Sequence, residues 1–199
     1  MPDTKERILI AALGLFARDG YEAVSVSAIA GSLGMTKSAL YKHYANKRDI
    51  FDSIARRMAE HDAAQAAAHG VPGGTLQQMA EAYRGTRLTQ IAAFAEAQFA
   101  YWTQDAFGAC FRRLLTLEQY RDQEMARLFQ QYLAAGPLAY AVDLFYGMTG
   151  DRERAKQLAI RFYAPMFLLY SVYDGAADKG AVTAMLRAHI SDFMKEQRL

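Results

Sequence analysis

The sequence predicts an all-α protein: an N-terminal three-helix domain with a helix-turn-helix, a fourth helix, and a C-terminal helical bundle, about nine helices in all. Apolar residues recur at helical spacing along nearly the whole chain, and no run alternates apolar and polar residues between hairpin turns. The composition agrees, because 52% of the 199 residues are hydrophobic and only 4 are proline. Disordered and collagen-like chains are therefore excluded.

The first two helices have clear boundary signals. A helix is expected over about 4–19, and Gly20 follows where a left-handed cap would end it. Ser25 can cap a short second helix, which Gly34 ends. Apolar residues form one stripe on each helix: Ile8, Ala11, Ala12, Leu15 and Phe16 on the first, and Val26, Ile29, Ala30 and Leu33 on the second.

The next two helices are predicted by their N-caps. Thr36 is expected to cap a third helix with Leu40 facing inward, and Asn46 to cap a fourth that runs from Lys47 towards His69. The Gly-Val-Pro-Gly-Gly segment at 70–74 is the strongest break in the chain, and we interpret it as a helix connection. Beyond it, helices are expected at about 75–104 (subdivided), 106–120, 122–147, 152–174 and 180–195.

Two functional domains are predicted, 1–50 and 51–199. The single cysteine, Cys110, cannot form an internal disulfide, and the N-terminus lacks a signal-peptide pattern, so we expect a cytoplasmic protein. The most apolar segment, 158–173, is interrupted by Arg161 and Pro165 and is shorter than the roughly 18 apolar residues of a membrane span. No membrane association is expected.

Positive charge gathers near the N-terminus. The net charge is +2, yet the stretch 36–48 holds Lys37, Lys42, Lys47 and Arg48, with His43 among them and no acid. Such a cluster is most often a solvated helix face. By itself it favours nucleic acid only weakly.

The stretch 26–41 has the pattern of a helix-turn-helix. Two helices that cross steeply tolerate only a small side chain at their contact, here Ala30, and the turn needs the positive φ that Gly34 supplies. Such turns also occur in helical proteins that never touch DNA. The spacing alone therefore leaves DNA binding open.

The residues that follow are more specific. The string Lys37-Ser-Ala-Leu-Tyr-Lys-His-Tyr-Ala-Asn-Lys-Arg-Asp-Ile-Phe51, after Gly20-Tyr21 and Ser25-Val26-x-x-Ile29-Ala30, closely resembles the DNA-binding domain of the TetR family of bacterial transcriptional regulators. The resemblance runs over about 4–51. It departs at Tyr44, where phenylalanine is commoner, and at Met35, where valine or isoleucine is usual. It implies a helical homodimer with a divergent, ligand-sensing C-terminal core.

Candidate DNA contacts follow from chemistry and from the resemblance. Hydroxyls at helix N-termini suit phosphate, and Lys37 leads the helix expected in the major groove, where it would contact guanine or a phosphate. Ser27 would approach base edges or simply pack, and Tyr41 would contact the backbone or be a core ring. The full set is Ser25, Ser27, Thr36, Lys37, Ser38, Tyr41, Lys42, His43 and Lys47.

The C-terminal part is rich in aromatic residues, most of which we interpret as core. The remainder would line an apolar effector pocket, for which we select Tyr83, Phe94, Phe99, Trp102, Phe107, Phe111 and Tyr140. The last two helices look like the family's dimer-forming pair, with Phe162, Met166, Leu169, Tyr173, Met185 and His189 at the interface.

The sequence carries no catalytic signature. The four histidines show no metal-ligand spacing, and there is no phosphate-binding glycine loop or nucleophile elbow, so no enzyme activity, metal or cofactor is expected. The predicted function is a dimeric repressor that binds a palindromic double-stranded DNA operator and is released by a small apolar or aromatic effector. The alternative is an architectural or partner-binding DNA protein of the same fold without an effector.

Overall fold

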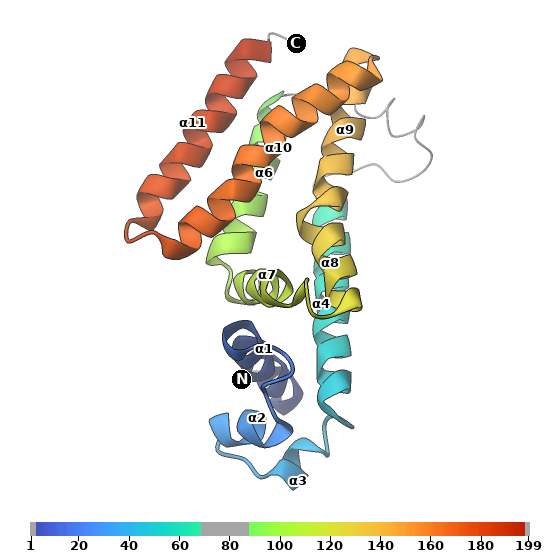
Figure 1. The fold of residues 1–199 in the computed structure, drawn as a ribbon, viewed down its shortest axis with the longest axis vertical. Helices are drawn as coiled ribbons and strands as arrows, with labels where there is room; N and C mark the ends of the chain where they lie inside the picture. Colours follow the sequence, from blue (N-terminus) through green and yellow to red (C-terminus); the bar gives the residue numbers. More distant parts are fainter. Residues whose placement is uncertain (1–2, 69–87, 198–199) are drawn as a thin grey trace. The chain divides into compact units, whose positions relative to one another are not determined.

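The structure, a computed structural model, describes residues 3–68 and 88–197 and is all-α there, with ten helices and no strand (Figure 1). The helices are α1 (Thr4–Asp19), α2 (Val26–Ser32), α3 (Lys37–Leu40), α4 (Lys47–Ala68), α6 (Leu88–Gln104), α7 (Ala106–Glu118), α8 (Gln123–Leu133), α9 (Ala135–Thr149), α10 (Arg152–Gly175) and α11 (Lys179–Gln197). The predicted fold class is confirmed. Within the described ranges no helix is both long and apolar enough to span a membrane.

Residue contacts divide the chain into two compact units, residues 1–68 with 106–129 and residues 69–105 with 130–199. These units describe packing. The predicted domains, 1–50 and 51–199, divide the chain by function and stay a prediction.

In the first unit, α1 packs against α7, α4 and α2. Apolar side chains of α1 to α4 form its core, among them Ile8, Phe16, Ile29, Leu40 and Ile54, which are fully buried. The expected stripe of α1 is shifted slightly, because Leu9 and Leu13 are buried while Ala11 and Leu15 are half-buried. The helix ends at Asp19, as predicted.

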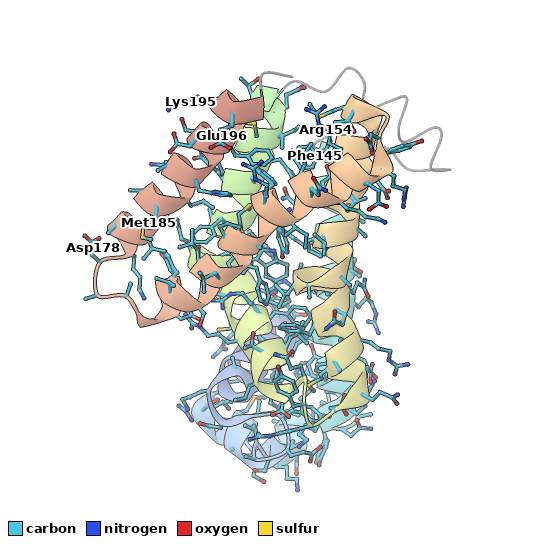
Figure 2. All side chains as sticks on the ribbon, turned by 45° about the horizontal axis from the view of Figure 1, so that its top comes forward. Phe145, Arg154, Asp178, Met185, Lys195 and Glu196 are labelled. Atoms are coloured by element: carbon cyan, nitrogen blue, oxygen red, sulfur yellow. The ribbon has the colours of Figure 1, made fainter. Side chains whose placement is uncertain are left out.

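In the second unit, α10 packs along α9 and α11, and α6 packs against α10 and α11. Aromatic rings fill the space between them. Phe145, labelled in Figure 2, meets Phe162 edge-on with ring centroids 5.8 Å apart, and Phe162 lies 5.0 Å from Phe193. Pro165 lies inside α10, which continues through it.

The expectation of one helix over 122–147 is wrong, because the structure has α8 and α9 there. Pro137 has no N–H to donate to the carbonyl of Leu133, the acceptor that a continuous helix would use. The hydroxyl of Tyr163 donates to that carbonyl instead, at 2.7 Å, and burial raises the pKa of this hydroxyl. Gly136 permits the sharp break, since a Cβ there would overlap the Gln131 carbonyl oxygen.

Candidate nucleic-acid interface

The helix-turn-helix has the geometry that its sequence predicts. The Ser25 hydroxyl accepts the N–H of Ala28 at 3.1 Å and caps α2. Gly34 has φ +65°, and the N–H of Met35 donates to the carbonyl of Ala30 at 3.0 Å, which fixes the turn.

The third and fourth helices also begin at their predicted caps. The Thr36 hydroxyl accepts the N–H of Ala39 at 3.2 Å. Asn46 accepts the N–H of Asp49 at 2.9 Å, and the Asp49 carboxylate accepts the N–H of Ala45 at the same distance. This reciprocal capping sets the start of α4.

Most predicted DNA contacts are on the surface of α2, α3 and the segment after them. Tyr41 is 44% exposed, so it is not a core ring, and the Lys37 ammonium lies 5.7 Å from the centre of its ring. His43 and Lys47 are half-buried. The exposed members are Ser25, Ser27, Thr36, Lys37, Ser38, Tyr41 and Lys42.

Lys47 is engaged with the turn between α1 and α2. Its Nζ donates to the carbonyl of Tyr21 at 2.8 Å and to that of Glu22 at 3.3 Å. It also lies 4.3 Å from the centre of the Tyr21 ring, a cation–π contact. The first residue of α4 is thereby joined to the residues that lead into α2.

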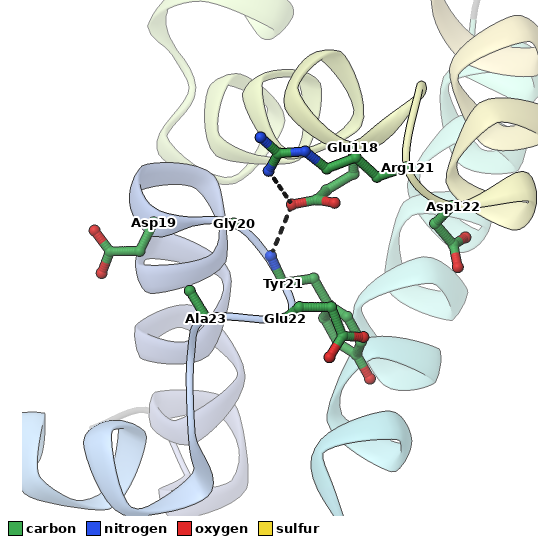
Figure 3. Close-up of a pocket in the computed structure, with 8 residues that line it drawn as sticks. All are labelled: Asp19, Gly20, Tyr21, Glu22, Ala23, Glu118, Arg121 and Asp122. Atoms are coloured by element: carbon green, nitrogen blue, oxygen red, sulfur yellow. Dashed lines mark hydrogen bonds and ion pairs between the residues drawn. The ribbon is translucent and has the colours of Figure 1, made fainter.

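A pocket of about 240 Å³ lies beside the same turn (Figure 3). Glu118 from the end of α7 reaches it and accepts the N–H of Tyr21 at 3.0 Å. No sequence pattern points to Glu118, because 97 residues separate it from Tyr21 and no spacing rule connects them. The pocket is lined by Asp19, Gly20, Tyr21, Glu22, Ala23, Glu118, Arg121 and Asp122.

Ion pairs join α4 to other elements of the first unit. The Arg48 guanidinium lies 2.6 Å from the carboxylate of Glu124 and 2.7 Å from that of Asp52. Its hydrogen bonds to these carboxylates, that to Glu124 above all, raise the pKa of Arg48. Arg57 pairs with Glu6 of α1. Arg48 and Arg57 thereby connect α4 to the start of α8 and to α1.

The residues predicted to bind an effector fall into both packing units. Phe94 lies 5.8 Å from Tyr140, and Phe99 stacks on Tyr170 at 5.4 Å, all in the second unit with Trp102. Phe107 and Phe111 stack on each other at 6.2 Å in α7 of the first unit. Tyr83 lies outside the described residues.

The residues predicted for the dimer interface lie on α10 and α11. Four of them, Phe162, Met166, Leu169 and Tyr173, are buried within the single chain. His189 is half-buried, with its Nε2 2.9 Å from the carbonyl oxygen of Phe162. Met185 is 55% exposed.

Comparisons with known proteins agree on the DNA-binding segment. The family model described as bacterial regulatory proteins, tetR family, matches residues 8–54. The HTH-type transcriptional regulator AcrR of Shigella flexneri is 38% identical over 52 residues, which are 26% of this chain and 24% of that protein. The match thus spans about a quarter of the length of this curated relative.

Solved structures share the fold over nearly the whole chain. A TetR-family transcriptional regulator from Bordetella parapertussis 12822 has a TM-score of 0.65 at 15% identity, covering 97% of this chain and 95% of that one. A putative transcriptional regulator from Saccharomonospora viridis, in complex with choline, has a TM-score of 0.60 at 18% identity, covering 96% and 95%.

The family match covers the two capped helices, the Gly34 turn and the start of α4, which are the elements that carry the exposed hydroxyls and lysines. Beyond residue 54 the agreement with the solved structures is one of fold. On these grounds residues 8–54 form a DNA-binding domain of the tetR family of bacterial regulatory proteins, and the chain as a whole shares the fold of TetR-family regulators.

Proposed function

We propose that this regulator is a repressor that binds a palindromic operator as a homodimer and leaves it when a small apolar effector binds. The observation that carries the proposal is the exposed surface of α2, α3 and the segment after them, where hydroxyls stand together with Lys37 and Lys42 and without an acid. A hydroxyl whose oxygen accepts a capping N–H still has its own O–H to donate to a phosphate. The cytoplasm, where bacterial DNA lies, is the compartment that the proposal requires.

Lys37 would read sequence. It is the first residue of α3, and its side chain is exposed. A lysine in the major groove can donate to O6 and N7 of guanine, a pair of acceptors that no other base presents in that arrangement. The neighbouring hydroxyls and Lys42 would bind phosphates and so set the register without reading bases.

An apolar stripe on the last two helices supports the dimer. Ile160, Phe167, Leu168 and Val172 of α10 are exposed, and their spacing places them on one helix face. Met185 of α11 is exposed as well. Exposed apolar surface of this kind marks an interaction site, and a second copy of the same pair of helices would cover it.

The effector is proposed to be a small apolar molecule, either planar and aromatic or aliphatic. The residues that support this are the aromatic side chains that α6 and α9 bring together within the second unit, where Phe94 lies 5.8 Å from Tyr140. The Saccharomonospora viridis relative was solved with choline, which is a precedent for a small-molecule ligand on this fold.

The DNA-binding test starts from a random pool of duplexes. The wild type is expected to enrich a near-palindrome, and Lys37→Ala should relax its preference at one base pair per half-site, worth about 1–3 kcal/mol. Lys42→Ala is the matched control, since an exposed phosphate contact carries no base preference. If Lys37→Ala keeps the full preference, Lys37 is a phosphate contact.

The effector test uses the enriched duplex. A panel of aromatic and fatty compounds is titrated while DNA release and the emission of Trp102, the single tryptophan, are followed together. At least one compound is expected to lower DNA affinity 5- to about 150-fold, which corresponds to a coupling of roughly 1–3 kcal/mol. If none releases DNA or stabilises the protein, the architectural alternative replaces the repressor.

A further inference from the structure

The turn between α1 and α2 is held by a carboxylate that comes from α7. We propose that Glu118 is a positioning residue for DNA binding: through Tyr21 it fixes the start of the helix-turn-helix relative to α7. The N–H of Tyr21 donates to Glu118 Oε1 at 3.0 Å, and Glu118 is only 3% exposed. The inference rests on the proposed function, because it assumes that α2 and α3 read DNA.

The burial of Glu118 makes this hydrogen bond important. A carboxylate removed from water is costly unless hydrogen bonds or opposite charge compensate it. The Arg121 guanidinium stands 3.7 Å away, but the Arg121 side chain is 67% exposed, so water screens much of its charge. The N–H of Tyr21 is therefore the stronger described partner.

Gly20 shows that the turn is shaped around this carboxylate. Its φ of +88° and ψ of 153° belong to a region that essentially only glycine adopts. A Cβ at Gly20 would also lie 2.7 Å from Glu118 Oε1, so the carboxylate would have to leave its present position. Figure 3 shows Glu118 reaching from its helix towards the backbone at Gly20 and Tyr21.

Tyr21 connects this contact to the DNA-binding helices. Its carbonyl accepts from Lys47 of α4, and its ring packs edge-on against Phe16 and Phe51, with centroids 5.0 and 5.5 Å away. Ser25, the cap of α2, follows four residues later. A displacement of the Tyr21 peptide therefore moves the start of α2, and with it the turn that carries α3.

The helix that carries Glu118 also carries two of the predicted effector residues. Phe107 and Phe111 precede Glu118 on α7, by roughly 16 and 10 Å along a helix that rises about 1.5 Å per residue. A helix shifted at one end by an effector shifts at the other end, because its backbone hydrogen bonds keep it rigid. Glu118 would pass that shift to Tyr21.

The test uses the full chain and the duplex that the wild type enriches from the random pool. Glu118→Ala is expected to weaken binding to that duplex about tenfold, and Glu118→Gln about threefold, because a neutral oxygen accepts more weakly than a carboxylate. The salt slope should stay the same, since no phosphate contact is lost. Arg121→Ala is the matched control and should bind like the wild type.

A second readout is hydrogen exchange of the Tyr21 amide, which should be faster in Glu118→Ala and Glu118→Gln and unchanged in Arg121→Ala. A variant that is less stable but binds the duplex like the wild type would show a merely structural role and overturn the inference. If Glu118→Ala does not fold, Glu118→Gln decides: wild-type affinity and wild-type exchange would overturn it. A wild type that enriches no duplex overturns the proposed function itself.

Discussion

Lys47 illustrates how one side chain can serve the fold and the ligand together. An ammonium has three N–H donors. Two of those of Lys47 bind the carbonyls of Tyr21 and Glu22, and the third can reach either the Glu22 carboxylate, 3.6 Å away, or a DNA phosphate. The sequence placed Lys47 among the candidate DNA contacts, and the structure adds its hydrogen bonds to the turn.

Lys47→Ala is therefore expected to have two effects. It should weaken binding to all sequences about equally and lower the magnitude of the salt slope by about 0.9, the value for one lost phosphate contact. It should also lower the free energy of unfolding by about 1 kcal/mol, because hydrogen bonds to the turn are lost. Lys42 is an exposed lysine nearby. Lys42→Ala should therefore change the salt slope and leave the free energy of unfolding unchanged. Reduced stability with an unchanged slope would assign Lys47 to the turn only.

The helix-turn-helix elements owe their boundaries to local hydrogen bonds. Ser25, Thr36 and Asn46 each accept an N–H from a residue three positions later. These contacts lie within one turn of chain, so the sequence was sufficient to predict them. The break between α8 and α9 was missed because Pro137 is tolerated in the first turn of a helix and also disrupts a helix interior, and only the Tyr163 contact with Leu133 distinguishes the two.

Two glycines of the helix-turn-helix should respond oppositely to alanine. At both Gly31 and Gly34 an added Cβ would meet no atom within 4 Å, so only the backbone decides. Gly34 has φ +65°, which alanine adopts poorly, so Gly34→Ala should lower the free energy of unfolding by about 1–2 kcal/mol. Gly31 lies inside α2, where alanine favours the helix, so Gly31→Ala should raise the free energy of unfolding by about 0.5–1 kcal/mol. Urea unfolding measures the free energy of unfolding of both variants relative to the wild type. Equal changes in the two variants would contradict this explanation.

At the scale of the molecule, the two faces of α10 differ in their burial within the chain. Phe162, Met166 and Leu169 face the core of their unit, whereas Leu168 is 63% exposed within the chain. A dimer would bury that second face. Large apolar residues occur on both faces. The sequence of α10 therefore predicts an interface helix but does not show which of its residues a second copy would contact.

Light scattering is expected to give twice the chain mass of 22.2 kDa for the wild type and the mass of a monomer for Leu168→Glu. A buried, unpaired carboxylate opposes association, while the helix content should stay the same because Leu168 is exposed in the single chain. Binding to the palindromic duplex should weaken, since the two half-sites lose their linkage. Tyr120 is a strongly exposed residue of the other packing unit, so Tyr120→Glu should change neither the mass in solution nor the affinity for the duplex. A monomeric wild type at micromolar concentration would contradict the dimer.

The amino-acid sequence by itself determined the helical class, the starts of α2, α3 and α4, and the family of the DNA-binding segment, because each depends on residues within a few positions of one another. Only the tertiary structure decided that Glu118 lies on the Tyr21 amide, 97 residues away, and which apolar face of α10 the chain buries. Capping and turn chemistry act through hydrogen bonds of short reach along the chain. Contacts between distant segments depend instead on how whole helices pack, and no local pattern encodes that.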